Sequence, residues 1–182
     1  DLRDVFLAPY YGWVAERIKE LIRPDTAEGE APEIPRYEGH RGPGTTAEVD
    51  FWTARDVREV RKSHVNYIVA DTKIWEQSAA YLIDSRDTVD SFVKNAGLGF
   101  AAPYFHNGER HDYLPDFIVR LAGDSERVLI LETKGFDELE SVKGEAAERW
   151  VKAVNADGKY GLWSYAVAKR PTDVVGLLKM AA

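Results

Sequence analysis

Cysteine is absent from this 182-residue sequence. That absence excludes disulfides, thiolate metal ligands and thiol nucleophiles, and it fits a reducing compartment, so we expect a cytoplasmic protein. No apolar run approaches the roughly 20 residues that a membrane-spanning helix needs, and no signal peptide is recognisable, so we expect no membrane association. The chain starts at Asp1 rather than Met, which favours a fragment of a longer protein.

Basic charge is also scarce. Lys and Arg number 24 against 31 Asp and Glu, for a formal net charge of −7. By itself this argues against nucleic-acid binding, because phosphate contacts need a basic surface. Two considerations weaken the objection: a carboxylate metal site is acidic when empty, and a nuclease domain can rely on a neighbouring domain to hold DNA. A basic run at Arg55, Arg58, Arg61 and Lys62 can contact phosphates, although solvated faces more often have this pattern.

The first 53 residues differ in character from the rest. Apolar spacing predicts an amphipathic helix over 4–23, and the Pro-, Gly- and charge-rich stretch 24–46 predicts a long loop. Residues 47–53 suit a short strand. We therefore expect an N-terminal arm or connector over 1–53 and a single domain over 54–182.

The second part predicts an α/β domain. Helical spacing predicts helices over 64–84, 87–95 and 138–156. Apolar runs predict strands over 98–105, 115–121, 127–133 and 160–168. The expected order is thus helix, three strands, helix, strand.

The strands over 115–121 and 127–133 enclose a Gly-Asp-Ser turn and predict a hairpin. A turn centred near residue 124 places Asp116 opposite Glu132. Lys134 lies two residues after Glu132 and points to the same face of the strand. Two carboxylates about 5 Å apart can share a hard divalent cation such as Mg²⁺, and a neighbouring lysine can orient water or stabilise charge on a phosphate. The backbone carbonyl of Thr133 is a further possible ligand.

An ion pair at a strand end is the alternative for these residues. Glu132 or Asp116 paired with Lys134 would be ordinary and of small energetic value if exposed. Geometry alone leaves the ion pair and the metal site both open.

The same residues resemble a family signature. Pro115-Asp116 followed by Glu132-Thr133-Lys134 resembles the PD-(D/E)xK motif of restriction-type nucleases, and the element order resembles their αβββαβ core. The segments WEQSAAYLIDS, FVKNAGLGFAAPY, HDYLPDFIVRL and LILETKG resemble the C-terminal nuclease domain of the Res subunit of type III restriction enzymes.

The resemblance implies a restriction-endonuclease-like fold, a mixed sheet flanked by helices, with an N-terminal helical arm. It implies an Mg²⁺-dependent DNA endonuclease (with Mn²⁺ able to substitute) in which Asp116 and Glu132 bind metal and Lys134 is catalytic. Glu76 matches a helix glutamate that often supports the metal in this superfamily. For Glu76 an exposed carboxylate paired with Lys73 is an equally good alternative.

The resemblance also implies partners. These are double-stranded DNA, an upstream helicase or translocase motor, and a methyltransferase subunit. The only phosphate-loop candidate, 39–46, lacks the required lysine and flanking elements, so ATP would act only through a motor outside this chain. Two alternatives remain: a nuclease-like fold that docks DNA or a partner without cutting, and a repair or recombination nuclease of the same superfamily.

Overall fold

The computed structural model describes residues 10–21, 44–69, 75–106, 109–133 and 140–182. Its elements are α1 (Tyr10–Leu21), a 3₁₀ turn η2 (Thr46–Glu48), β1 (Val57–Glu59), β2 (Tyr67–Val69), α2 (Trp75–Asp84), β3 (Val89–Lys94), β4 (Ala102–His106), β5 (Glu109–Tyr113), β6 (Phe117–Leu121), β7 (Arg127–Thr133), α3 (Glu140–Asp157), β8 (Leu162–Ala168) and α4 (Asp173–Ala181).

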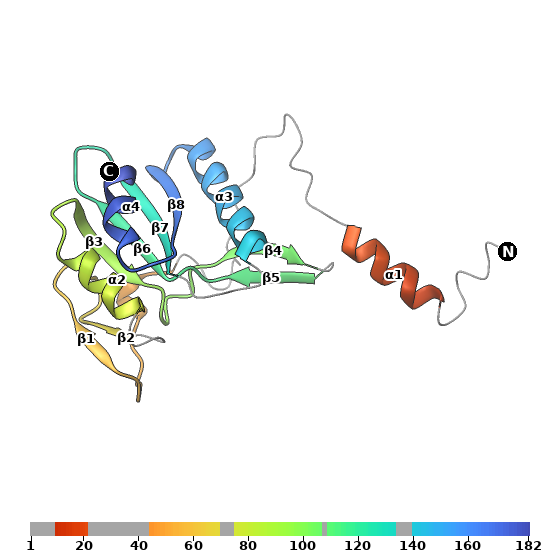
Figure 1. Ribbon diagram of the computed structural model, residues 1–182, viewed down its shortest axis with the longest axis horizontal. Coiled ribbons are helices and arrows are strands. Elements are labelled where there is room, and N and C mark those ends of the chain that lie inside the picture. Colours follow the sequence, from red (N-terminus) through yellow and green to blue (C-terminus); the bar gives the residue numbers. More distant parts are fainter. Residues whose placement is uncertain (1–9, 22–43, 70–74, 107–108, 134–139) are drawn as a thin grey trace.

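A four-stranded mixed sheet forms the centre of the molecule (Figure 1). Its strand order is β3-β6-β7-β8, in which β3, β6 and β7 are antiparallel neighbours and β8 is parallel to β7. The parallel pair requires a crossover, which α3 provides between β7 and β8. The elements of this sheet and its helices follow the order α2, β3, β6, β7, α3, β8, with the β4–β5 hairpin inserted after β3.

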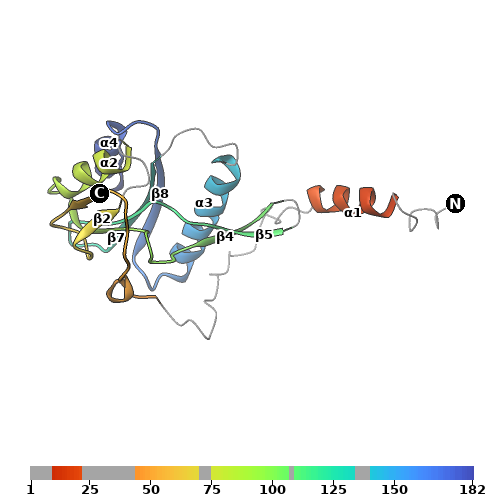
Figure 2. The same ribbon diagram turned by 90° about the horizontal axis from the view of Figure 1, so that it is seen from below.

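Helices cover both faces of the sheet. Alternate residues of β6 and β7, such as Phe117, Val119, Leu129 and Leu131, pack with α2 and α4 in the larger core. The opposite face packs against α3, which also contacts β4 and β5 through a smaller cluster that includes Tyr113. Figures 1 and 2 show α2 and α4 on one side of the sheet and α3 on the other. The expectation of a mixed sheet flanked by helices is therefore confirmed.

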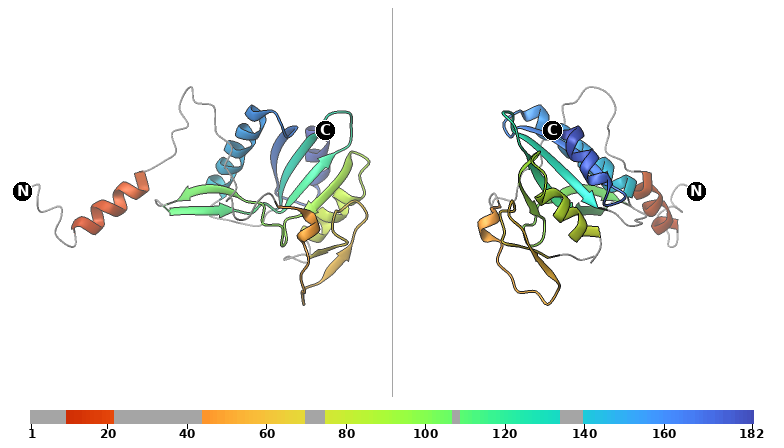
Figure 3. Two further views of the ribbon diagram at one scale, coloured as in Figure 1. Left: turned by 180° about the vertical axis from the view of Figure 1, so that it is seen from behind. Right: turned by 60° about the vertical axis from the view of Figure 1, so that its left-hand side comes forward.

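The 115–133 hairpin, the helix that follows it and the last strand were predicted correctly. β6 and β7 fall within the two predicted strands, α3 matches the predicted helix over 138–156, and β8 the strand over 160–168. The strand predicted over 98–105 corresponds to β4, which pairs with β5 as a separate two-stranded ribbon. Figure 3 shows this ribbon extending away from the central sheet.

One predicted helix is correct only in its second half, and another is wrong. The stretch 64–84 contains the strand β2 before α2 begins at Trp75, and 87–95 contains β3, which pairs with β6. Both stretches are rich in β-branched residues, including Val65, Ile68, Val69 and Val89, and these favour a pleated, half-buried strand once a partner strand is available.

Other differences concern the ends of the chain. The short strand predicted over 47–53 is wrong: the segment holds the end of η2 and no strand. α1 lies inside the amphipathic helix predicted over 4–23. Its apolar residues Tyr10 and Ile18, which such a helix would bury, are exposed. The C-terminal helix α4 was not predicted. None of the described helices is long and apolar enough to cross a membrane.

Candidate active site

The β6–β7 pairing brings the two predicted acids to one end of the sheet. Phe117 faces Leu131 and Ile118 faces Ile130, so the register predicted from the turn is confirmed. The ladder ends at Phe117 and Leu131, and the same register continued by one residue would place Asp116 opposite Glu132. Asp116 is also held on its other side, because the backbone N–H of Asn95, which follows β3, donates to the Asp116 carbonyl at 2.8 Å.

Asp116 is anchored by the last residue of β7. The backbone N–H and the hydroxyl of Thr133 both donate to Oδ2 of Asp116, at 2.7 Å and 2.5 Å. Within the described part of the chain, Oδ1 of Asp116 has no hydrogen-bond or ion-pair partner. One carboxylate oxygen is thus fixed in place and the other is available for a ligand.

Glu132 is buried and receives a hydrogen bond from a tyrosine. The hydroxyl of Tyr113, at the end of β5, donates to Oε2 of Glu132 at 2.6 Å. Tyr113 is only 2% exposed, and its burial, together with the neighbouring Glu132 carboxylate, raises the pKa of Tyr113 well above its usual value. The phenol therefore stays protonated and serves as a permanent donor that stabilises the charged form of Glu132.

Glu76 forms a buried ion pair. Its Oε2 lies 2.9 Å from Nζ of Lys94, and both side chains are less than a tenth exposed. Lys94 faces Phe117 across the β3–β6 pair, with Nζ 5.6 Å from the centre of the Phe117 ring. Phe117 packs with α2 in the larger core, and Lys94 faces Phe117, so the Glu76–Lys94 pair lies on the α2 side of the sheet. Asp116 directly precedes Phe117, so the pair lies at the same end of the sheet as Asp116.

The remaining predicted residues are placed as follows. Thr133 is the last residue of β7, directly after Glu132. Lys134 falls in 134–139, outside the described residues. Within the described ranges no group of three or more His, Asp and Glu side chains is arranged to hold a metal ion. A metal here would therefore be held by Asp116, Glu132 and backbone or water oxygens.

This donor set suits Mg²⁺. Carboxylate and carbonyl oxygens are the hard ligands that Mg²⁺ prefers, and it keeps several waters rather than requiring a full cage of side chains. A cation held by the half-buried Asp116 and the buried Glu132 would also neutralise their negative charges.

Sequence reasoning missed Tyr113 and Lys94. The signal for Lys94 was a single lysine closing the apolar run SFVK, which is unusual at a buried strand end. Tyr113 carried no such signal, because its contact depends on how β5 crosses the end of β7.

A scan against protein-family models, a search of curated proteins and a search of solved structures find no match for this chain. The geometry of the site and the sequence resemblance therefore carry the functional argument.

Proposed function

We propose that this chain is a metal-dependent DNA endonuclease domain, the cleavage module of a type III restriction enzyme Res subunit. The observation that carries the proposal is that Asp116 and Glu132 lie at the same end of the β6–β7 hairpin, each held by its own hydrogen-bond donor. If one of these acids merely formed an ion pair with Lys134 at the strand end, the two acids would not each need a hydrogen-bond donor to hold them in place.

The element order gives further support. The sequence α2, β3, β6, β7, α3, β8 corresponds to the αβββαβ core of restriction-type nucleases. Asp116 directly precedes β6 and Glu132 lies in β7, which are the second and third strands of this order. The proposed fold is therefore restriction-endonuclease-like.

The residues of the chain divide the chemistry among them. Asp116, Glu132 and the Thr133 carbonyl would hold Mg²⁺, which when bound lowers the pKa of coordinated water and polarises a phosphoryl oxygen. Thr133 fixes Asp116, and Tyr113 fixes Glu132, so neither acid needs to reorganise when substrate arrives. Lys134 orients the attacking water and stabilises charge on the phosphate as the bridging oxygen leaves.

Glu76 has a supporting role in this proposal. Its carboxylate neutralises Lys94 beneath the end of β3, and the next residue, Asn95, hydrogen-bonds to Asp116. Glu76 thus helps to fix the strand end on which Asp116 depends.

The proposed partners are double-stranded DNA, an ATP-driven helicase motor and a methyltransferase subunit. The test is cleavage of plasmid DNA by the full assembly with Mg²⁺ and ATP. We expect Asp116→Ala and Lys134→Ala each to abolish cleavage while assembly and ATP hydrolysis persist. Cleavage at the wild-type rate in either variant would refute the assignment.

A docking module that binds DNA or a partner without cutting is the second candidate. The net charge of −7 favours it, since an acidic chain binds phosphates poorly by itself. Metal titration separates the two, because a docking module has no Mg²⁺ or Mn²⁺ site that depends on Glu132.

A further inference from the structure

Two adjoining hollows form a groove along the β1–β2 ribbon, which we call the Trp52 groove. The larger hollow has a volume of about 550 Å³ and is lined by Phe51, Trp52, Arg55 and the Ala96-Gly97 turn. This volume lies within the roughly 300–1,000 Å³ usual for ligand sites. The smaller hollow, about 150 Å³, shares Phe51, Val69 and Ala96 with the larger one and continues toward Tyr67 and Lys94.

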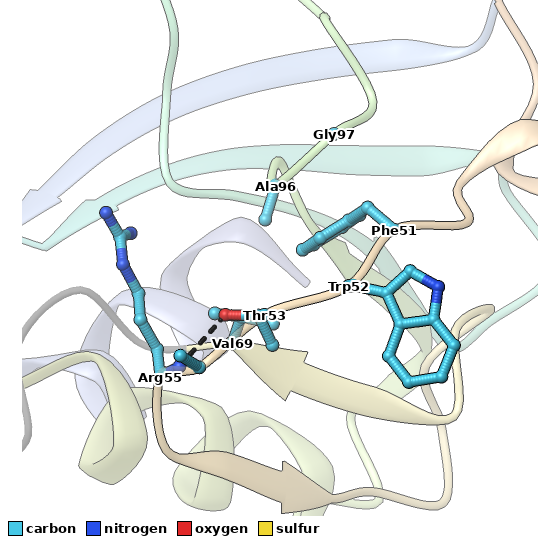
Figure 4. Close-up of a pocket in the computed structure, with 8 residues that line it drawn as sticks. Phe51, Trp52, Thr53, Arg55, Val69, Ala96 and Gly97 are labelled. Carbon is cyan, nitrogen blue, oxygen red and sulfur yellow. Dashed lines mark hydrogen bonds between the residues drawn. The ribbon is translucent and has the colours of Figure 1, made fainter.

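Aromatic rings dominate the groove. The Trp52 side chain is fully exposed, and Phe51 and Tyr67 are each about half exposed. Three adjacent aromatic rings that face water are uncommon on a protein that does not use them for binding. Figure 4 shows the Phe51 ring pointing toward Ala96 and Gly97, with Trp52 and Arg55 on either side of it.

The floor of the groove is held in place by a glycine. Gly97 has φ +74°, and a Cβ there would lie 2.9 Å from the Phe51 ring. The Phe51 ring therefore packs directly on the turn that follows β3.

The inner hollow reaches the end of β3, next to the residue that hydrogen-bonds to Asp116. Lys94 lines the inner hollow and forms the buried pair with Glu76. The next residue, Asn95, donates its N–H to the carbonyl of Asp116. A strand that lies in the groove would therefore lead to the end of the sheet where Asp116 and Glu132 meet.

We propose that the Trp52 groove binds unpaired nucleobases of a DNA strand that enters this active site. The proposal rests on the nuclease function proposed above. Trp52, Phe51 and Tyr67 provide stacking faces, and Arg55 provides a cation for the backbone or for stacking on a base. Because any base offers a π-face, the groove would bind with little sequence preference.

A nucleic acid fits these features. Its bases stack on flat aromatic rings, and its phosphates pair with an arginine. Continuity with a site proposed to cut phosphodiesters points the same way.

The test is binding of a fluorescein-labelled oligothymidine to the 182-residue chain, followed by anisotropy at low ionic strength in EDTA, so that no cutting occurs. We expect Trp52→Ala to weaken binding between about 5-fold and about 100-fold, since each stacked base contributes about 1–3 kcal/mol. Trp52→Phe keeps a ring and should recover most of the loss. The fully exposed Trp52 makes few contacts, so these changes should leave folding intact.

Trp13→Ala is the matched control, because Trp13 is also largely exposed but lies on α1, outside the groove. An oligonucleotide with abasic sites should bind more weakly to the wild-type chain and should bind the wild-type and Trp52→Ala chains alike. Equal affinity of Trp52→Ala, Trp13→Ala and wild type would overturn the proposal.

The experiments distinguish a wrong groove proposal from a wrong nuclease proposal, because the two give different results. A wild-type chain that binds no oligonucleotide, while its metal site at Glu132 is intact, would overturn the groove proposal alone and assign the groove to a protein segment. Loss of the metal site with base-dependent binding retained would overturn the nuclease proposal alone.

Discussion

Asp116 and Thr133 are joined by two hydrogen bonds to a single carboxylate oxygen. The N–H of Thr133 donates at 2.7 Å and its hydroxyl at 2.5 Å, both to Oδ2 of Asp116. These two bonds tie Asp116, the residue before β6, to Thr133, the last residue of β7, and so they close the open end of the hairpin. Because Oδ2 is held by Thr133, the orientation of Oδ1 is fixed as well, which is the arrangement expected of a preorganised metal ligand.

The first prediction concerns this closure. Thr133→Val removes the hydroxyl and keeps the shape and the N–H, so the free energy of unfolding should fall by about 1–2 kcal/mol, the range for a partly exposed hydrogen bond to a charged group. Thr133→Ser retains the hydroxyl and should stay close to wild type. Urea unfolding measures both. Equal stability of the valine and serine variants would contradict the role of the hydroxyl.

Tyr113→Phe tests the donor to Glu132. The variant leaves a buried carboxylate without its hydrogen bond, and we expect a loss of about 1.5–3 kcal/mol in unfolding free energy. Metal affinity should also change, because the orientation of Glu132 is no longer fixed. Calorimetric titration with Mn²⁺ measures the affinity; an unchanged dissociation constant would show that Tyr113 serves stability alone.

The stability should also depend on alkaline pH through Tyr113. Burial and the Glu132 carboxylate raise the pKa of Tyr113 well above its usual value of 10.0 in the folded chain. The unfolded chain can release the phenolic proton above that pH while the folded chain holds it. The contribution of Tyr113 to the free energy of unfolding is therefore fully present below about pH 10. Above that pH it declines by about 1.4 kcal/mol per pH unit. The difference in unfolding free energy between wild type and Tyr113→Phe should shrink from about pH 10 to pH 11. A constant difference would contradict the raised pKa.

The Glu76–Lys94 pair predicts strong coupling. Lys94→Met leaves the buried Glu76 charge without this cation and should cost about 3–5 kcal/mol. Glu76→Gln combined with Lys94→Met should cost less than the sum of the two single variants, because no unpaired charge remains. Urea unfolding of the four proteins gives the coupling energy, and additive losses would contradict the ion pair. The Glu76 carboxylate is engaged with Lys94 and is therefore not expected to be a main metal ligand. Glu76→Gln should thus weaken metal binding less than Glu132→Gln does.

Gly161→Ala provides a control for general destabilisation. Gly161 has φ +77°, and a Cβ there would lie 2.4 Å from the carbonyl oxygen of Glu126, so the substitution strains the backbone before β8. We expect a loss of at least about 1–3 kcal/mol in unfolding free energy. This contact lies at the end of the β7–β8 pair opposite to the candidate site, so metal affinity should not change. A parallel loss of metal affinity would mean that affinity follows global stability.

The sequence was sufficient to predict the hairpin and its acids because that information is local. Two apolar runs around a Gly-Asp-Ser turn determine the register, and the register brings Asp116 to Glu132. The helix α3 and the strand β8 were likewise predictable from their own periodicity. The Lys134 prediction lies outside the described residues and stays a prediction.

The parts that were missed depend on contacts distant in sequence. The stretch around Val89 and Phe92 was predicted as a helix, and it becomes a strand because β6, more than twenty residues later, pairs with it. The bond from Tyr113 to Glu132 and the pair of Glu76 with Lys94 both join separate elements. Composition and spacing carry no information about such contacts until the topology is known.

Calorimetric titration with Mg²⁺ or Mn²⁺ tests the central claim most directly. The account predicts a metal site in the wild-type chain that is lost in Asp116→Asn and in Glu132→Gln, while both variants stay folded and Lys134→Ala retains the site. Asp116→Asn is a close isostere whose side-chain oxygen can still accept from Thr133, so loss of binding would report the missing charge. Identical heats for wild type and both acid variants would contradict the assignment of Asp116 and Glu132 as metal ligands.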